Sequence, residues 1–270
     1  MDLASIMVSV DLGAAAPHRI RLATDLAKRF EAQLIGVAAR PVSPPAGSGN
    51  PFEAIQVTDV GKAQAGEDLS RANAVYERSI DGFVRASWRS DLAHPLTHLV
   101  RHSRAADVVV VGRCAADPGM GSMNVLPGPL VVEAGRPVLV SPPGLGTLRI
   151  GGVVVAWKDT PEARRAVHHS IPFLERSDRV FVVAVSPEGD DDGAEDVAAY
   201  LSRHGVAVTA HLLRGQDVGV SETLLRFVAR EGADLLVMGA YGRSRLREWI
   251  FGGVTHEILQ TTPVCCLMSN

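Results

Sequence analysis

The stretch GVVVAWKDTPEARRAVHHSIPFLERSDRVFVVAVSP, residues 152–187, has the pattern of a strand, a turn, an amphipathic helix and a second strand. Its two apolar runs, VVVAW and VFVVAV, are nearly continuous. Such runs are typical of strands that are buried on both faces of a parallel sheet. Strands that alternate with helices of this length predict an α/β fold with a doubly wound parallel sheet.

The same pattern occurs earlier in the chain, at residues 5–40. Val8 aligns with Val155 and Leu34 aligns with Phe181, and both pairs are 147 residues apart. A repeat of this kind indicates that one structural unit occurs twice in the chain.

The repeat resumes later with a smaller offset. The segment ADVVVVGR (106–113) parallels ADLLVMGA (233–240) with an offset of 127, and RPVLVSPP (136–143) parallels TPVCCLMS (262–269) with an offset of 126. Because the offset falls from 147 to 127, the first half carries about 20 additional residues. We expect them in a surface loop at 41–61, which is rich in proline, glycine and serine.

These alignments predict two tandem Rossmann-like domains, residues 1–145 and 146–270, joined by a link at about 142–151. We expect the two domains to pack along their final strands as a pseudo-dimer within one chain. In the second domain we expect strands at 152–157, 179–185, 206–213, 234–239 and 263–268, and helices at 161–175, 193–204, 219–231 and 253–261.

Composition excludes several classes of protein. The 270 residues are 46% hydrophobic and 21% charged with a net charge of −3, and no concentrated basic stripe indicates nucleic-acid binding. No apolar run reaches the ~20 residues that span a bilayer, and the first residues lack a basic leader, so we expect a cytoplasmic protein. Cys114, Cys265 and Cys266 have neither disulfide nor zinc spacing, and we expect them to be packing residues.

A glycine-rich stretch, MGAYGRSRLREWIFGGVTHEIL (238–259), lies where a buried strand gives way to a helix. Small residues there would leave backbone amides free, and a helix start attracts phosphate through unpaired N–H groups and its dipole. An ordinary turn is the open alternative. The residues that we expect to line a phosphate site are Met238, Gly239, Gly242, Arg243, Gly252, Gly253, Val254 and Thr255, with Arg245 and Arg247 nearby.

The spacing Gly-x2-Gly-x9-Gly, here Gly239, Gly242 and Gly252, resembles the ATP-binding signature of universal stress proteins. With the repeated strand-helix-strand start and the closing TPV strand, the resemblance covers nearly the whole chain as two tandem domains. It implies an adenine-nucleotide alpha-hydrolase-like fold, with five parallel strands per domain and pairing through the last strand. Where members of this family bind ATP, the adenine would here lie near Ala156, Trp157, Lys158, Asp159, Val183 and Val185.

The C-terminal half departs from the family pattern at two positions. Gly253 stands where most ATP binders have Ser or Thr, and Lys158 stands where the family tends to have Asp, with Asp159 one step later. Each departure removes about one hydrogen bond, although Lys158 could pair with a phosphate. Trp157 has two open interpretations, as a core residue or as part of an adenine pocket.

The N-terminal half departs further. It retains Asp11, but Gly112, Gly119, Gly121 and Gly128 lack the expected spacing. Pro127 and Pro129 flank its presumed helix start, and proline has no N–H to offer a phosphate. We expect this half to be structural or to bind something else.

We find no nucleophile elbow, no Walker A motif and no dinucleotide fingerprint, and we expect no main enzymatic role. The resulting hypothesis is a sensor or regulator of the stress response that binds ATP, with or without Mg²⁺. The alternative is a non-nucleotide scaffold that acts through protein association, and homo-oligomers are possible. A slow nucleotide hydrolase is a third hypothesis. His168 and His169 are adjacent on a helix and are not expected to share a metal.

Overall fold

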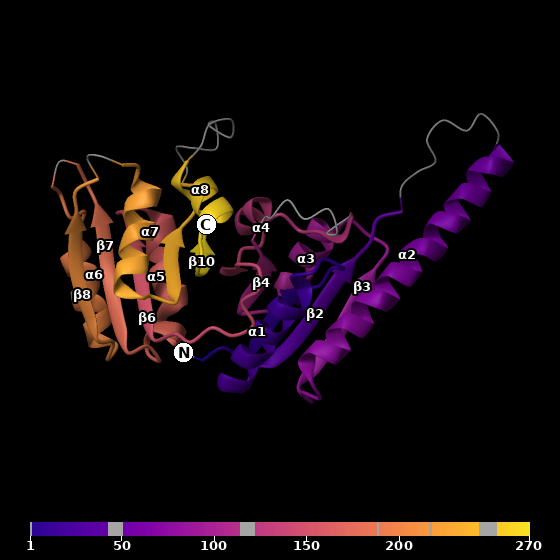
Figure 1. The fold of residues 1–270 in the computed structure, drawn as a ribbon, viewed down its shortest axis with the longest axis horizontal. Helices are drawn as coiled ribbons and strands as arrows, with labels where there is room; N and C mark the ends of the chain where they lie inside the picture. Colours follow the sequence, from indigo (N-terminus) through magenta and orange to yellow (C-terminus); the bar gives the residue numbers. More distant parts are fainter. Residues whose placement is uncertain (1, 43–50, 114–121, 188, 216–217, 243–252) are drawn as a thin grey trace.

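The computed structural model describes residues 2–42, 51–113, 122–187, 189–215, 218–242 and 253–270. Within these ranges strands and helices alternate in each half of the chain, and β5 is followed directly by β6 (Figure 1). The N-terminal half contains β1 (Ser5–Ser9), α1 (Ala16–Arg29), β2 (Gln33–Ala39), α2 (Pro51–Ile80), β3 (Ala86–Asp91), α3 (Pro95–Ser103), β4 (Val108–Gly112), α4 (Pro127–Glu133) and β5 (Val138–Ser141). The C-terminal half contains β6 (Gly152–Trp157), α5 (Pro161–Leu174), β7 (Arg179–Val185), α6 (Ala194–Arg203), β8 (Val208–Leu213), α7 (Val220–Glu231), β9 (Leu235–Gly239), α8 (Val254–Thr261) and β10 (Cys265–Ser269).

The ten strands form one sheet in the order β3-β2-β1-β4-β5-β10-β9-β6-β7-β8. Each half contributes five parallel strands in the same order, which confirms the predicted α/β fold with two doubly wound units. The halves meet at β5 and β10, which pair antiparallel with Cys266 opposite Val140. These are the two final strands that were expected to pair.

Helices cover both faces of the sheet. Side chains of α1, α2, α5 and α6 pack on one face, and those of α3, α4, α7 and α8 pack on the other. Each face carries one hydrophobic cluster with members from both halves, so the core is continuous across the β5–β10 junction. Cys265 and Cys266 point to opposite faces and are completely buried, in agreement with a packing role.

The structure corrects the alignment of the second strands. Val153 pairs with Val180 in the C-terminal half, as Ile6 pairs with Leu34 in the N-terminal half. Leu34 therefore corresponds to Val180 and not to Phe181, whose side chain lies on the opposite face. The turn after the first helix differs by one residue, and a slip of one residue in a strand exchanges its faces.

The loop expected at 41–61 is wrong in its second part, because α2 begins at Pro51 and runs for 30 residues to Ile80. Its C-terminal turns pack against the core through Ala72 and Tyr76, and Figure 1 shows the helix lying beside β3 at the edge of the sheet. The ring of Tyr76 occupies the space beside Gly36, where a Cβ atom would come within 2.6 Å of the ring. The additional residues of this half therefore lengthen a helix.

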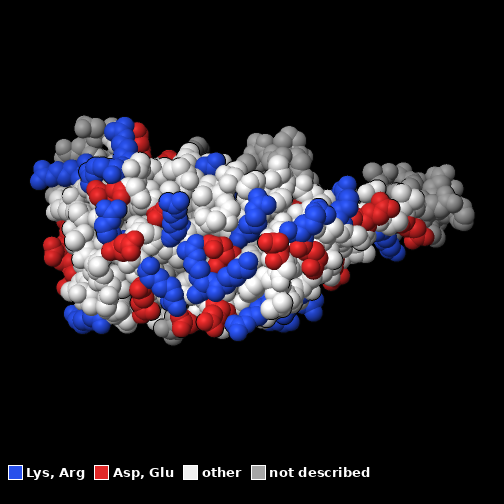
Figure 2. Space-filling view, turned by 60° about the horizontal axis from the view of Figure 1, so that its bottom comes forward, with Lys and Arg blue, Asp and Glu red and all other residues white. Residues whose placement is uncertain are grey.

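No helix in the part of the chain that the structure describes is long and apolar enough to cross a membrane. Figure 2 shows Lys and Arg interspersed with Asp and Glu over the displayed face, without a large region of one sign. This face offers no continuous basic surface of the kind that binds nucleic acid.

Candidate functional site

The strand order places a switch point at the carboxyl ends of β6 and β9. The chain leaves β6 towards β7 and leaves β9 towards β10, so the loops after these neighbouring strands diverge. Ligands of open parallel sheets bind at such a switch point. Ala156 and Met238 are partners at this edge, which brings together two of the predicted site residues.

Three of the predicted adenine-lining residues and Met238 share one face of the sheet. Val183 and Met238 are buried there, and Ala156 and Val185 are partly exposed against the same cluster, on the side of α7 and α8. They form an apolar surface beside the switch point. Such a surface can receive a flat, apolar ring.

Trp157 does not belong to this surface. As the next residue along β6 it points to the opposite face, where it is 8% exposed and packs with residues of α5 and α6. Its Nε1 donates a hydrogen bond to the backbone oxygen of Asp192 at 2.8 Å. Because side chains alternate along a strand, Trp157 and Ala156 cannot line the same side of a ligand.

Gly239 lies at the point where β9 ends, and its lack of a side chain serves packing. A Cβ atom at this position would lie 2.5 Å from the backbone nitrogen of Ala163 and 2.7 Å from the carbonyl carbon of Glu162. The first turn of α5 therefore rests directly on this glycine. The need for glycine here follows from helix packing, without any ligand.

Glu162 is a residue that the sequence reasoning missed. Its side chain is 6% exposed, and its Oε1 accepts a hydrogen bond from Arg165 Nη2 at 3.2 Å. A Cβ atom on Gly242 would lie 3.4 Å from its Oε2. A carboxylate thus lies beside the glycine loop, and the only signal for it was the preference of acidic residues for a helix start.

The start of α8 has the predicted features where the structure describes it. Gly253 is the residue before the first turn, with extended backbone at φ −93° and ψ 161°, and no side chain caps the helix start. Val254 and Thr255 are partly exposed. The N–H groups of this turn and the Thr255 hydroxyl are donors of the kind that bind oxyanions.

The remaining predicted residues lie around this edge or outside the described residues. Lys158 and Asp159 are exposed after β6, and the Asp159 carboxylate is paired with Arg164. Arg243 and Gly252, with Arg245 and Arg247, fall in 243–252, which is outside the described residues.

In the N-terminal half, the protein's own side chains lie at the equivalent edge of the sheet. Asp11 Oδ2 accepts a hydrogen bond from Arg19 Nη2 at 2.6 Å, with both side chains almost completely buried. Arg19 Nε also donates to the Ser9 backbone oxygen. At the start of α4, the Tyr241 hydroxyl of the other half lies only 2.7 Å from where a Cβ on Gly128 would be.

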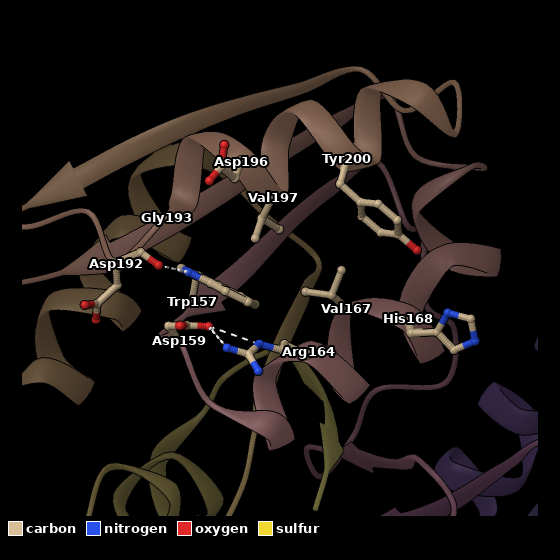
Figure 3. A pocket seen from close by; sticks show the side chains of 10 residues that line it. All are labelled: Trp157, Asp159, Arg164, Val167, His168, Asp192, Gly193, Asp196, Val197 and Tyr200. Carbon is tan, nitrogen blue, oxygen red and sulfur yellow. Dashed lines mark hydrogen bonds and ion pairs between the residues drawn. The ribbon is translucent and has the colours of Figure 1, made fainter.

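A cavity of about 450 Å³ lies between α5 and α6, on the opposite face of the sheet from Ala156 and Val183 (Figure 3). Of the predicted site residues it includes Trp157 and Asp159. It is a separate feature from the switch point between β6 and β9.

Comparison with known proteins agrees with this architecture. The model of the universal stress protein family matches residues 151–269. The structure is similar to a universal stress protein from Archaeoglobus fulgidus DSM 4304, with a TM-score of 0.72 at 14% identity over 98% of this chain and 96% of that one. It is also similar to a putative universal stress protein from Pseudomonas aeruginosa UCBPP-PA14, with a TM-score of 0.57 at 15% identity over 99% of this chain and 93% of that one.

No curated protein matches the chain. At these identities the two solved structures establish the fold, and the family model identifies the C-terminal half. Residues 151–269 therefore form a domain of the universal stress protein family, and the N-terminal half repeats the fold of that domain.

Proposed function

We propose that the chain is a cytoplasmic sensor or regulator of the stress response that binds an adenine nucleotide, with ATP as the first candidate. The site would lie in the second of two domains, which we divide between residues 145 and 146. The observation that carries the proposal is the shared face of Ala156, Val183, Val185 and Met238 beside the switch point. The adenine would lie on this apolar surface.

The start of α8 supports the same proposal. Its uncapped first turn presents N–H groups, and Thr255 adds a hydroxyl donor one residue after Val254. The positive end of the helix dipole favours a phosphate there. The partly exposed Gly239 and Gly242, together with Lys158 and Arg243, complete the set of residues that we assign to ribose and phosphates.

Two observations favour the second candidate, a scaffold that binds no nucleotide and acts through protein association. The buried carboxylate of Glu162 lies beside Gly242, where it would repel a phosphate. Gly239 is explained by the packing of α5 alone. A homo-oligomer would suit this second candidate.

We do not propose a catalytic role. The described residues around the switch point offer Glu162 as a carboxylate, but Arg165 already donates to it from the surface of α5. Any hydrolysis of ATP would be slow, and a bound Mg²⁺ would come with the nucleotide's own phosphates.

The proposal is tested by calorimetric titration of the full chain with ATP and by native mass spectrometry of the purified protein. We expect about one ATP per chain. Thr255→Ala should weaken binding about tenfold to a hundredfold, because a hydrogen bond to a charged phosphate contributes roughly 1.5–3 kcal/mol.

Thr261→Ala is the matched control, since it makes the same change at the other end of α8, where the Thr261 hydroxyl donates to the Glu257 backbone oxygen. Its affinity for ATP should stay within about twofold of the parent, as expected of a surface change away from the ligand. Gly239 is unsuitable as a probe, because a side chain there would collide with α5. Absence of both retained nucleotide and binding at millimolar ATP would favour the scaffold.

A further inference from the structure

The ten-stranded sheet has two outer edges, β3 in the N-terminal half and β8 in the C-terminal half. The two strands hold the same position in the repeat but differ in their protection. The sequence of β3, ASWRSD, carries the charged residues Arg89 and Asp91, and α2 lies beside this strand in Figure 1. Charged side chains and a covering helix are common means by which proteins prevent an edge strand from pairing.

The edge strand β8 lacks these features. Its sequence, VTAHLL (208–213), contains no Lys, Arg, Asp, Glu, Gly or Pro, and the side chain of Leu212 is 40% exposed. Among the described residues no further strand lies on the outer side of β8, which stands at the left end of the molecule in Figure 1. An uncharged edge strand of this kind is a template for another strand.

The hydrogen bonds to β7 identify the backbone groups of β8 that are free. The N–H of Ser186 donates to the Leu213 oxygen at 3.0 Å, so the peptide groups of Leu213 face β7. Because these groups alternate along a strand, the N–H and C=O of Val208, Ala210 and Leu212 point away from the sheet. They have no partner in the part of the chain that the structure describes.

The outward groups are self-complementary in an antiparallel arrangement centred on Ala210. A two-fold axis at this point places Ala210 opposite its own copy and Val208 opposite Leu212, so that all three residues exchange backbone hydrogen bonds. On the other face of the joint sheet, Thr209 lies opposite His211. No pair in this register brings two like charges together.

The helix that covers β8 adds charge complementarity. Helix α6 packs on β7 and β8 and runs against them, because it connects two parallel strands. Its first turn carries Glu195 and Asp196 and its last turn carries Arg203, all three exposed. The same two-fold axis sets the two α6 helices antiparallel on one face, with the acidic end of each on the side of the basic end of the other.

We propose that the outer edge of β8 binds a second copy of this chain, through antiparallel β8–β8 pairing that continues the sheet across two molecules. A second copy fits better than an unrelated strand, because the backbone groups, the side chains and the helix charges all match themselves about one axis. The pairing is short, so the dimer is reversible. This interface is separate from the proposed nucleotide site, and its test requires no ATP.

The test is sedimentation velocity of the full chain between about 1 and 300 µM, the range of weak, reversible interfaces. We expect a monomer at the lowest concentrations and a dimer at the highest. Amide hydrogen exchange at both ends of the range locates the interface. The amides of Val208, Ala210 and Leu212 should exchange at least about fivefold more slowly in the dimer, because they gain hydrogen bonds there.

Two variants address the edge itself. Leu212→Lys places a charge on it, and Ala210→Pro removes an outward N–H that β7 does not use. Each should raise the dissociation constant of the dimer at least about tenfold, because the two-fold axis applies every change twice. Leu92→Lys is the matched control, since Leu92 is 45% exposed just after β3 at the opposite edge, and it should change the constant less than about twofold.

Circular dichroism of each variant confirms that it is folded, and either folded edge variant is sufficient for the comparison. The proposal is overturned by a dimer in which the three outward amides remain unprotected, or by a dimer that resists the edge variants. It is also overturned by a chain that stays monomeric over the whole range, a result that would leave this edge to a strand of another protein.

Discussion

The two halves share one fold but end their first strands differently. After β1, Asp11 is neutralised by Arg19 inside the protein, and both side chains are buried. After β6, the corresponding residue is Lys158, which is exposed, and Ala166 stands where the N-terminal half has Arg19. The same strand edge thus carries a buried internal ion pair in one half and an exposed lysine in the other.

The starts of α4 and α8, the last helix of each half, show a similar contrast. At the start of α4, Pro127 lacks an N–H, and the hydroxyl of Tyr241 from the other half lies over Gly128. At the start of α8, Val254 and Thr255 follow Gly253 and, unlike proline, have backbone N–H groups. The comparison teaches that a repeated fold can keep its switch point and still lose the donors that a ligand needs. We therefore propose nucleotide binding for the C-terminal half alone.

The largest difference between the halves should appear when the ion pair is broken. Arg19→Met leaves the Asp11 carboxylate buried without its partner, which should lower the free energy of unfolding by about 3–5 kcal/mol. Lys158→Met in the other half should change it by less than about 0.5 kcal/mol, because Lys158 is exposed. Urea unfolding followed by circular dichroism measures both. Equal losses would contradict the contrast.

A second, smaller difference concerns two glycines. Gly239→Ala places a methyl group against backbone atoms of α5 and should cost about 1–3 kcal/mol of stability. Gly128→Ala meets only the end of the Tyr241 side chain, which can move, and should cost less than about 1 kcal/mol. Thermal unfolding of the two variants side by side compares them, and a larger loss for Gly128→Ala would show that Tyr241 is held rigidly.

Acid should affect the N-terminal half more through its paired histidines. Burial lowers the pKa of His98 and the pKa of His102 below the ordinary value of 6.5. Arg89 Nη1 lies 3.1 Å from His102 Nδ1, and a guanidinium can only donate, so this nitrogen accepts from it in the neutral ring. The unfolded chain then binds more protons than the folded one below about pH 6.5, and stability falls as the pH falls through that range.

The histidine variants should sharpen this comparison. His98→Gln/His102→Gln should flatten the loss of stability between pH 7.5 and 5.5 more than His169→Gln does in the C-terminal half. Burial also lowers the pKa of His169. This is one side chain, whereas the N-terminal half has two neighbouring histidines whose pKa burial lowers. Urea unfolding at several pH values supplies the slopes, and an unchanged slope in the double variant would exclude these two side chains as the source.

The sequence predicted the arrangement of strands and helices well, because apolar runs and the internal repeat report directly on burial. The pairing of the halves along their final strands, RPVLVSPP and TPVCCLMS, was expected, whereas its antiparallel sense comes from the structure. The long α2 was missed in its first turns, since the proline-rich stretch before Pro51 hides the start of the helix. The offset at Leu34 was wrong by one residue, because turn lengths are not encoded in apolar runs.

The site was less predictable, because its decisive features depend on contacts between distant segments. The pattern of glycines cannot show that Gly239 makes room for Ala163 rather than for a phosphate. Nor does the sequence reveal that Asp11 is held by Arg19. The placement of Trp157 was open at that stage, and the pleat of β6 assigns it to the other face.

The central claim, that only the C-terminal edge binds nucleotide, is tested most directly by amide hydrogen exchange with and without saturating ATP. We predict slower exchange at residues 158–160 and 253–257, with no change at 11–16 and 127–133. Protection at the N-terminal segments, or at both edges, would contradict the account.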